Sequence, residues 1–318
     1  MDTFDVPRTS RLPENHPVVS LILLLSLVLG GAIVFGLLSV WIAFAATSGS
    51  AGIGIGAMLD GSNPDVGVIK IIQAGSSIGM FVIPALLFAF VERRRTQYLN
   101  FSAQVNPTRW FLVIAIMFFS APLIDQSIKI NEQMQLPAAL AGLENWMAAK
   151  EAELERLTKL LLSDTTYGGL LINLLVVAVI PAVGEELLFR GCVQGIVTRW
   201  FRNPHAGIWI TAIIFSAIHL QFYGFLPRML LGALFGYILL WGRTIWLPIL
   251  AHFLNNGAAT VSAFYLLREG KSMDDLDLST QVPSYLYFLS FVLTGILLYQ
   301  YYKIAPEPQT AIKRRKRS

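Results

Sequence analysis

Gly184-Glu185-Glu186-Leu187-Leu188-Phe189-Arg190 is the stretch that decides the fold, because its three charged side chains interrupt a segment that is otherwise apolar. Leu170 to Val183, which precede it, are apolar apart from Asn173, and Leu187 to Val197 are mostly apolar. A charged side chain at the centre of a transmembrane helix costs about 2.5–3.5 kcal/mol on insertion scales. A transmembrane helix with a purely structural role has no reason to carry charged side chains at this cost. The charges therefore indicate either a functional site or a salt-bridged helix end near the lipid headgroups.

The two glutamates cannot have the same role if this stretch is helical. Adjacent residues of an α-helix point about 100° apart, so Glu185 and Glu186 face different neighbours. Glu186 and Arg190 are four residues apart and share a face, which predicts an ion pair between them. Glu185 is then free to face the interior of a helix bundle.

The composition indicates a membrane protein. Of 318 residues, 55% are hydrophobic and only 14% are charged, whereas soluble domains carry roughly 25% charged residues. Several windows of about 20 apolar residues predict an all-α, polytopic integral membrane bundle with the lipid bilayer as its surroundings. The basic residues lie at predicted membrane edges, so the net charge of +4 gives no case for nucleic acid as a partner. The single cysteine, Cys192, excludes an internal disulfide and a cysteine-built metal site.

The hydropathy pattern predicts about eight transmembrane helices. Their expected ranges are Val18–Ala46, Val68–Val91, Trp110–Ile128, Leu170–Trp200, Ala206–Leu220, Leu226–Trp241, Ile245–Leu267 and Tyr285–Tyr302.

Three regions follow from these spans. Residues 1–165 are expected to hold the first transmembrane helices and an amphipathic outer-face helix within 129–165. That helix carries apolar residues at seven-residue steps, namely Leu140, Met147, Leu154 and Leu161, which favours a surface connector. Residues 166–303 are expected to form the transmembrane catalytic core, and 304–318 a basic cytoplasmic tail.

Loop charges predict the orientation in the membrane. The tail from residue 303 carries a net charge of +5 and residues 92–109 carry +3, whereas 129–165 and 268–283 carry −2 each. Lys and Arg are enriched in cytoplasmic loops. All four segments therefore agree with a multi-pass protein whose two termini are both cytoplasmic.

Further polar side chains lie inside the predicted spans. His219 ends the fifth span, and His252 and Asn256 lie one helical turn apart on the seventh. One buried histidine is usually a hydrogen-bonded packing residue. Two histidines, a carboxylate and an amide on three separate helices fit a convergent site better.

These residues resemble a known family. The series Glu-Glu-x-x-x-Arg at 185–190, Phe-x-x-x-His at 215–219 and His-x-x-x-Asn at 252–256 is similar to that of the CAAX-protease and bacteriocin-processing family, also called CPBP or Abi. The Ras-converting CAAX endopeptidase is a eukaryotic member. The similarity covers roughly residues 170–264. Each motif alone is weak, but three motifs in order on separate predicted helices are strong.

The resemblance implies an intramembrane endopeptidase acting on a membrane-associated, prenylated or leader-type protein. By this analogy Glu185 is the general base and His219 helps to hold and polarise the water. His252 and Asn256 would contact the oxyanion, while Glu186 and Arg190 would be structural or orienting. No cofactor is favoured. Hydrolysis of a peptide bond needs this combination of an activated water and oxyanion donors.

Two alternatives stay open. Zinc held by Glu185, His219 and His252 would make the protein a metalloprotease. A non-enzymatic transporter or scaffold would also place charges inside the membrane. The span boundaries raise one difficulty for any convergent site: at 1.5 Å per residue, His219 lies about 10 Å nearer the outer face than Glu185. Either the fourth helix begins deeper, with a kink at Pro181, or the fifth starts late.

Overall fold

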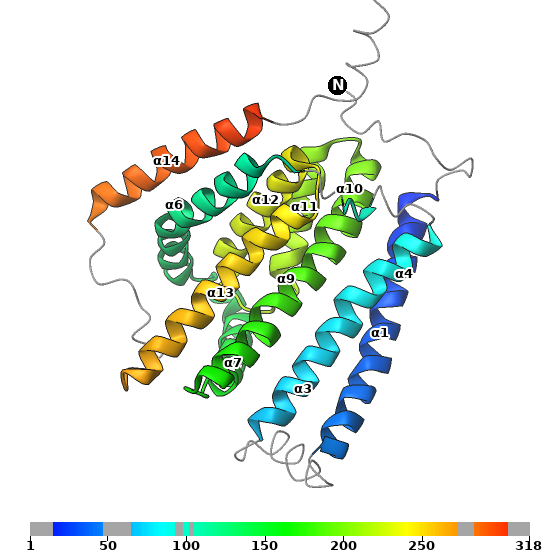
Figure 1. The fold of residues 1–318 in the computed structure, drawn as a ribbon, viewed down its shortest axis with the longest axis vertical. Helices are drawn as coiled ribbons and strands as arrows, with labels where there is room; N and C mark the ends of the chain where they lie inside the picture. The colour runs from blue at the N-terminus through cyan, green and yellow to red at the C-terminus, as the bar shows by residue number, and fades with distance from the viewer. Residues whose placement is uncertain (1–14, 47–64, 93–97, 102–104, 273–282, 305–318) are drawn as a thin grey trace, which may run out of the picture.

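The structure is a computed structural model that describes residues 15–46, 65–92, 98–101, 105–272 and 283–304, and within these residues every regular element is helical (Figure 1). The α-helices are α1 (Pro17–Ala46), α3 (Val66–Ser77), α4 (Ile83–Val91), α6 (Pro107–Glu132), α7 (Ala141–Leu161), α8 (Tyr167–Asn173), α9 (Ile180–Glu185), α10 (Gln194–Phe201), α11 (Pro204–Ala217), α12 (Phe225–Gly242), α13 (Trp246–Arg268) and α14 (Ser284–Lys303). Three π-helical segments, η1 (Ile78–Val82), η3 (Leu174–Val179) and η4 (Glu186–Val193), join some of these into longer rods, and η2 (Ala138–Leu140) is a 3₁₀ turn before α7.

A helix occupies each of the eight predicted spans. Six rods are long and apolar enough to cross a membrane: 17–46, 66–91, 107–132, 167–201, 225–242 and 284–303. The protein is therefore a multi-pass membrane protein. Helix α11 has only 14 residues, and α13 is long enough at 23 residues but carries His252, Asn255 and Asn256, which lower its hydropathy. The eight-span prediction is confirmed for six helices by length and composition.

One end of the bundle is joined by hydrogen bonds between predicted cytoplasmic segments. Ser20, near the start of α1, donates to Glu92 at 2.6 Å, and Arg199, near the end of α10, donates to Ser20 at 2.8 Å. Arg109, at the start of α6, donates to the carbonyl oxygen of Gly242 at 3.0 Å. The ends of three rods and the starts of two others thus share one side, as alternating spans require.

The opposite end gathers the predicted outer segments. Asn131, near the end of α6, donates to the carbonyl oxygen of Phe222 at 2.9 Å. Glu151 of α7 accepts from the backbone N–H of Tyr223 at 3.0 Å. Helix α7 has no buried residue, which agrees with a helix at the surface of the bundle.

Helix α1 and the rod α3–η1–α4 pack closely because glycines face each other. A Cβ on Gly31 would overlap the carbonyl oxygen of Gly79, and a Cβ on Gly79 would overlap the side chain of Phe35. Small residues at such contacts let helix backbones approach, which is how helices associate in lipid. In Figure 1 this pair lies on one side of the long rod 167–201, and α11–α13 lie on the other. The rod with the glutamates is therefore central.

Candidate active site

The rod that carries the glutamates begins at a side-chain cap. Thr166 accepts from the backbone N–H of Gly169 at 2.9 Å, and Asp164 accepts from the N–H of Thr166 at 2.9 Å. These bonds satisfy donors that the first helical turn leaves unpaired. The same hydrogen bonds from Thr166 lower the pKa of the Asp164 carboxyl from its ordinary value. The sequence of the cap thus explains why the rod starts at Tyr167.

The rod is not the regular α-helix that the sequence analysis assumed. It is π-helical over η3 (Leu174–Val179) and again over η4 (Glu186–Val193). Pro181 lies in the first turn of α9, directly after η3, and proline removes a backbone donor from the interior of a helix. π-helical turns are rare and often lie at functional sites. The irregularity expected at Pro181 is thus present as a π-helical turn.

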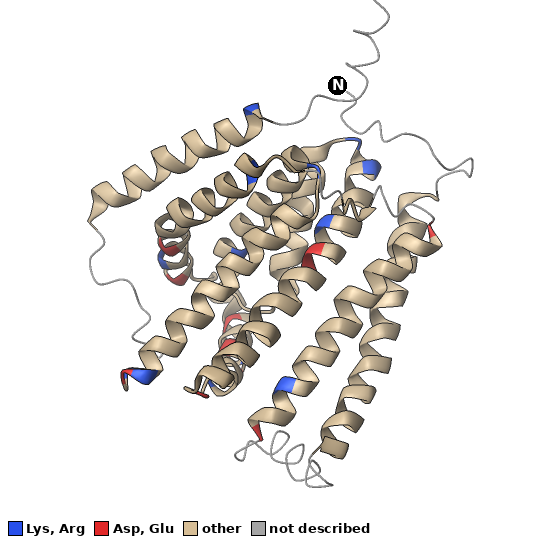
Figure 2. Ribbon diagram, in the orientation of Figure 1, with Lys and Arg blue, Asp and Glu red and all other residues tan. Residues whose placement is uncertain are grey.

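The predicted ion pair between Glu186 and Arg190 is confirmed. Glu186 Oε1 lies 3.0 Å from Arg190 Nη1, and both side chains are fully buried. This is a close charge contact rather than an aligned hydrogen bond, since Nη1 has no hydrogen-bond partner in the described residues. Arg190 Nη2 donates to the carbonyl oxygen of Gly232 at 3.2 Å. Its guanidinium also lies 4.5 Å from the centroid of the Phe215 ring, a cation–π contact. In Figure 2 these charges are adjacent red and blue segments partway along a rod that is mostly tan.

His252 lies between the two glutamates. Its Nδ1 is 2.8 Å from Glu186 Oε1, and its Nε2 is 3.8 Å from Glu185 Oε2. An ionised carboxylate only accepts hydrogen bonds, so Nδ1 carries a proton and donates it to Glu186. The ring stacks on Phe235 with centroids 5.3 Å apart. Arg190, Glu186 and the Phe235 ring therefore fix the imidazole so that Nε2 faces Glu185.

Glu185 differs from its neighbour. Its side chain is 12% exposed, against 0% for Glu186. The 3.8 Å separation from His252 is longer than a hydrogen bond, and no hydrogen bond to the Glu185 carboxylate is present among the described residues. The geometry agrees with the expectation that Glu186 is paired and Glu185 is available to a ligand or a water.

His219 lies closer to this group than the predicted spans implied. Helix α11 ends at Ala217 after 14 residues, so it does not reach the outer face as a span to Leu220 would. Helices α10 and α11 are antiparallel neighbours, and Glu185 and His219 lie at nearly equal sequence distances from the turn between them. Phe215, one helical turn before His219, touches Arg190 in the opposite rod. The early end of α11 and the contact of Phe215 with Arg190 favour a similar depth for His219 and Glu185.

The ring of Phe215 connects the two histidines. Its centroid is 5.0 Å from that of His219 and 6.1 Å from that of His252. His219 Nδ1 lies 2.7 Å from the carbonyl oxygen of Phe215. A carbonyl accepts, so Nδ1 carries the proton and Nε2 is left with a lone pair. His219 can therefore accept a hydrogen bond from a water or substrate at Nε2.

Asn256 lies one turn beyond His252 and is held by the glutamate rod. Its Nδ2 donates to the carbonyl oxygen of Val177 at 3.2 Å. Val177 lies in the π-helical segment η3, shortly before Pro181, which has no backbone N–H. Asn256 thus supplies a side-chain donor to the rod at an irregular part of its backbone. An amide NH₂ has two hydrogens, so the second N–H of Asn256 is left to donate to a ligand.

Arg228 of α12 is a residue that the sequence analysis missed. Its guanidinium donates to the backbone and side-chain oxygens of Gln221, two residues after His219. A signal was present in the sequence, because Arg228 is a cation within an apolar span and such residues are functional candidates.

The described residues present no preformed set of metal ligands. Within the ranges that the structure describes, no three His, Cys, Asp or Glu side chains lie close enough together to hold a metal ion. Nδ1 of His252 is bonded to Glu186, so Nε2 is the ring nitrogen that is open to a ligand. We therefore derive no step through a metal.

Fold and site together define a class: a helical multi-pass membrane protein with carboxylates, imidazoles and an amide gathered at mid-bundle. Residues 167–258 match the family model described as Rce1-like, type II CAAX prenyl endopeptidase. The chain thus carries a domain of this family, and the resemblance drawn from the three motifs is confirmed. The match runs from the start of α8 into α13 and includes all three motifs. No curated protein and no solved structure matches the chain.

Proposed function

We propose that the protein is an intramembrane endopeptidase in which Glu185 activates the attacking water. The observation that carries the proposal is the available Glu185 carboxylate facing His252 across 3.8 Å in the buried centre of the bundle, within a domain of a CAAX endopeptidase family. A carboxylate that works as a base needs to be within reach of a water and of the bond that is cleaved.

The steps balance as a simple hydrolysis. Glu185 accepts a proton from water while the water oxygen attacks the carbonyl carbon of the substrate, and His219 Nε2 accepts a hydrogen bond from the same water. As an imidazolium, His252 keeps Nδ1–H on Glu186 and donates Nε2–H to the oxyanion that forms, and the second N–H of Asn256 donates to the same oxyanion. Glu185 then passes its proton to the leaving amine, the C–N bond breaks, and a carboxylic acid and an amine are released.

Glu186 and Arg190 have a positioning role in this proposal. Glu186 accepts from His252 Nδ1 at 2.8 Å, and Arg190 lies 3.0 Å from the same carboxylate oxygen. Fixing one nitrogen of an imidazole orients the other, as in hydrolytic triads. The pair therefore aims His252 at the reacting carbonyl.

The expected substrate is a protein that reaches the site from the membrane. A prenylated C-terminal peptide is the form that the family description names, and a lipid anchor would concentrate such a substrate at the bilayer.

The Glu185→Gln variant tests the base. It keeps the shape of the side chain but cannot accept the proton, so cleavage is expected to fall by roughly 10²–10⁴-fold with the melting temperature unchanged. The probe is a farnesylated reporter peptide cleaved by purified protein in liposomes. Glu132→Gln, at an exposed carboxylate at the end of α6, is the matched control and should cleave normally. Full activity of Glu185→Gln would refute the assignment.

A metal assay separates the two hydrolytic mechanisms. In the proposed mechanism, purified active protein keeps its activity after chelation. Stoichiometric zinc, lost with activity on chelation and restored with it, would replace the metal-free mechanism by the zinc mechanism.

We also propose that both termini are cytoplasmic, on the four loop charges. Cysteine introduced at Ser272 is expected to react with an impermeant thiol reagent from outside intact cells, and cysteine at Ser318 only after permeabilisation. Cys192 is buried and adds little background. Labelling of residue 318 in intact cells would reverse the orientation.

A further inference from the structure

We propose that Asn131 of α6 and Glu151 of α7 are positioning residues for His219. Both precede the family match, which begins at residue 167. The proposal rests on the proposed function, because it takes His219 as a residue that binds the attacking water. It adds that two helices outside the family domain determine where that residue lies.

His219 lies on a short connection between two helices. Helix α11 ends at Ala217 and α12 begins at Phe225, so residues 218–224 form the turn that carries His219. Leu220, the next residue, has φ +53°, a left-handed conformation that costs free energy for a residue with a side chain. Strain of this kind persists where the surrounding structure holds it in place. The contacts that hold the turn therefore decide the position of His219.

Asn131 binds the far end of the turn with both groups of its side-chain amide. Its Nδ2 donates to the carbonyl oxygen of Phe222 at 2.9 Å, and its Oδ1 accepts from the backbone N–H of Leu226 at 2.6 Å. The residue is only 1% exposed. A buried backbone group that loses its partner is costly, so this one amide fixes two points of the backbone relative to α6.

Glu151 binds the middle of the turn. Its carboxylate accepts from the backbone N–H of Tyr223 at 3.0 Å. An ionised carboxylate is an acceptor only, and a bond between a carboxylate and a backbone N–H is stronger than a bond between two neutral groups. Helix α7 lies at the surface of the bundle and is thus attached directly to the turn that carries His219.

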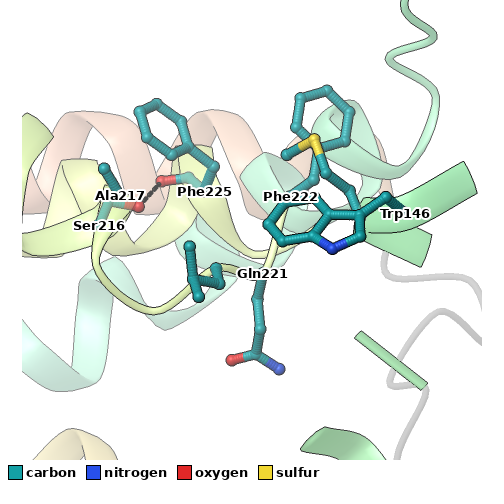
Figure 3. A pocket seen from close by; sticks show the side chains of 8 residues that line it. Trp146, Ser216, Ala217, Gln221, Phe222 and Phe225 are labelled. Carbon is teal, nitrogen blue, oxygen red and sulfur yellow. Dashed lines mark hydrogen bonds between the residues drawn. The ribbon is translucent and has the colours of Figure 1, made fainter. Parts of the chain in front are cut away.

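Two further contacts come from within the family domain. Ser216, near the end of α11, donates to the carbonyl oxygen of Phe225 at 2.6 Å, and Figure 3 shows this bond. Arg228 of α12 donates to the backbone and side-chain oxygens of Gln221. The turn is therefore held by side chains from four helices, and two of these, α6 and α7, precede the family domain.

The position of the turn matters because His219 and Glu185 come from different rods and are proposed to act on the same water. A misplacement of about 1 Å by a change far from the chemistry can lower a rate by about 10²-fold. The water is used in the chemical step, so loss of a positioning residue is expected to lower kcat rather than to raise KM.

A double-mutant cycle tests whether Asn131 acts through His219. In purified protein in liposomes with a farnesylated reporter peptide, Asn131→Ala should lower kcat by up to about 10²-fold. In the His219→Ala background the same change should have little further effect, because residues that act as a unit are not additive. Gln133→Ala is the control, since Gln133 is an exposed amide two residues further along the chain. Equal losses from Asn131→Ala in both backgrounds would overturn the proposal.

Glu151 gives a second test at a partly exposed side chain, where a substitution leaves the fold intact. Glu151→Ala removes the acceptor for Tyr223, whereas Glu151→Gln keeps an acceptor oxygen. We expect kcat to fall in the first variant and to recover in the second, with equal melting temperatures. Glu155→Ala is the control, because Glu155 pairs with Lys159 on the same helix. Equal values of kcat for Glu151→Ala and Glu151→Gln would contradict the role of Glu151.

The tautomer of His219 provides a readout that needs no catalysis. The contact of Nδ1 with the carbonyl oxygen of Phe215 at 2.7 Å selects the Nδ1–H tautomer. In nitrogen-15 spectra of histidine-labelled protein, the His219 signal is identified by its loss in His219→Ala. It should show one tautomer in wild type and a mixture in Asn131→Ala, because the ring reaches Phe215 only while the turn is held.

The spectra also separate the two proposals. An unchanged His219 signal in Asn131→Ala would overturn the positioning role. If wild-type protein cleaves no peptide but the signal changes in Asn131→Ala, the endopeptidase assignment fails and the positioning of His219 stands.

Discussion

Two rods of the bundle are interrupted by the same kind of π-helical turn, but the turns have different roles. In the rod 66–91, η1 (Ile78–Val82) comes just before Pro84, and in the rod 167–201, η3 (Leu174–Val179) comes just before Pro181. The two rods also touch, since a Cβ on Gly184 would lie 2.9 Å from the Cβ of Phe81. The same backbone irregularity is therefore found on both sides of one contact.

What surrounds each π turn differs. Around η1, Gly79 lies against Phe35 of α1, and the sequence has no charged residue between Lys70 and Glu92. Beside η3, Asn256 reaches the backbone from α13, and Glu185 and Glu186 follow within the next turns. A π turn next to proline is a packing device in the first rod. It becomes part of a candidate active site only where other helices supply polar side chains.

The largest expected effect is on the buried charges of the second rod. Removing one member of a buried ion pair costs roughly 3–5 kcal/mol, because the other charge is left unpaired. Arg190→Ala should therefore lower the melting temperature and the folded yield in detergent. Lys150→Ala is the control: Lys150 pairs with Glu153 on the surface of α7, and surface pairs contribute about 0–1 kcal/mol. Equal melting temperatures for Arg190→Ala and wild type would contradict the importance of the pair.

Asn256→Ala sharpens the comparison at η3. Loss of an oxyanion donor should lower the rate of cleavage by roughly 10²–10³-fold, and loss of the bond to Val177 should cost about 0.5–1.5 kcal/mol of stability. Pro181→Ala separates the two, because alanine supplies a backbone N–H at this irregular part of the rod. In that background Asn256→Ala should still lose rate but lose less stability. An unchanged rate would leave Asn256 with a structural role only.

The smallest effect on stability and activity together is expected where α1 packs against the rod 66–91. Gly31→Ala puts a Cβ against the backbone of Gly79, and overpacking of this kind costs typically about 1–3 kcal/mol. Gly30→Ala is its neighbour with nothing within 4 Å of the added Cβ, and alanine is about 1 kcal/mol better than glycine in a helix. Thermal unfolding should therefore rank Gly30→Ala at or above wild type and Gly31→Ala below it. The opposite order would refute the close contact of α1 with η1.

Much of the site was predictable because charge in an apolar helix is costly wherever it lies. Glu186 and Arg190 are four residues apart, and their ion pair follows from that spacing. His219, His252 and Asn256 stood out as polar residues inside predicted spans. Arg228 carried the same signal and was overlooked.

The sequence by itself determined the class of protein, the places of eight helices and the candidate polar residues, because hydrophobic length and charge cost are properties of the chain alone. Only the tertiary structure decided which of these residues meet. Neighbouring helices decide where the π turns lie and where α11 ends. They also decide that the Asn256 side chain donates a hydrogen bond to the carbonyl oxygen of Val177. Contacts between helices arise from packing, and no local pattern of residues encodes them.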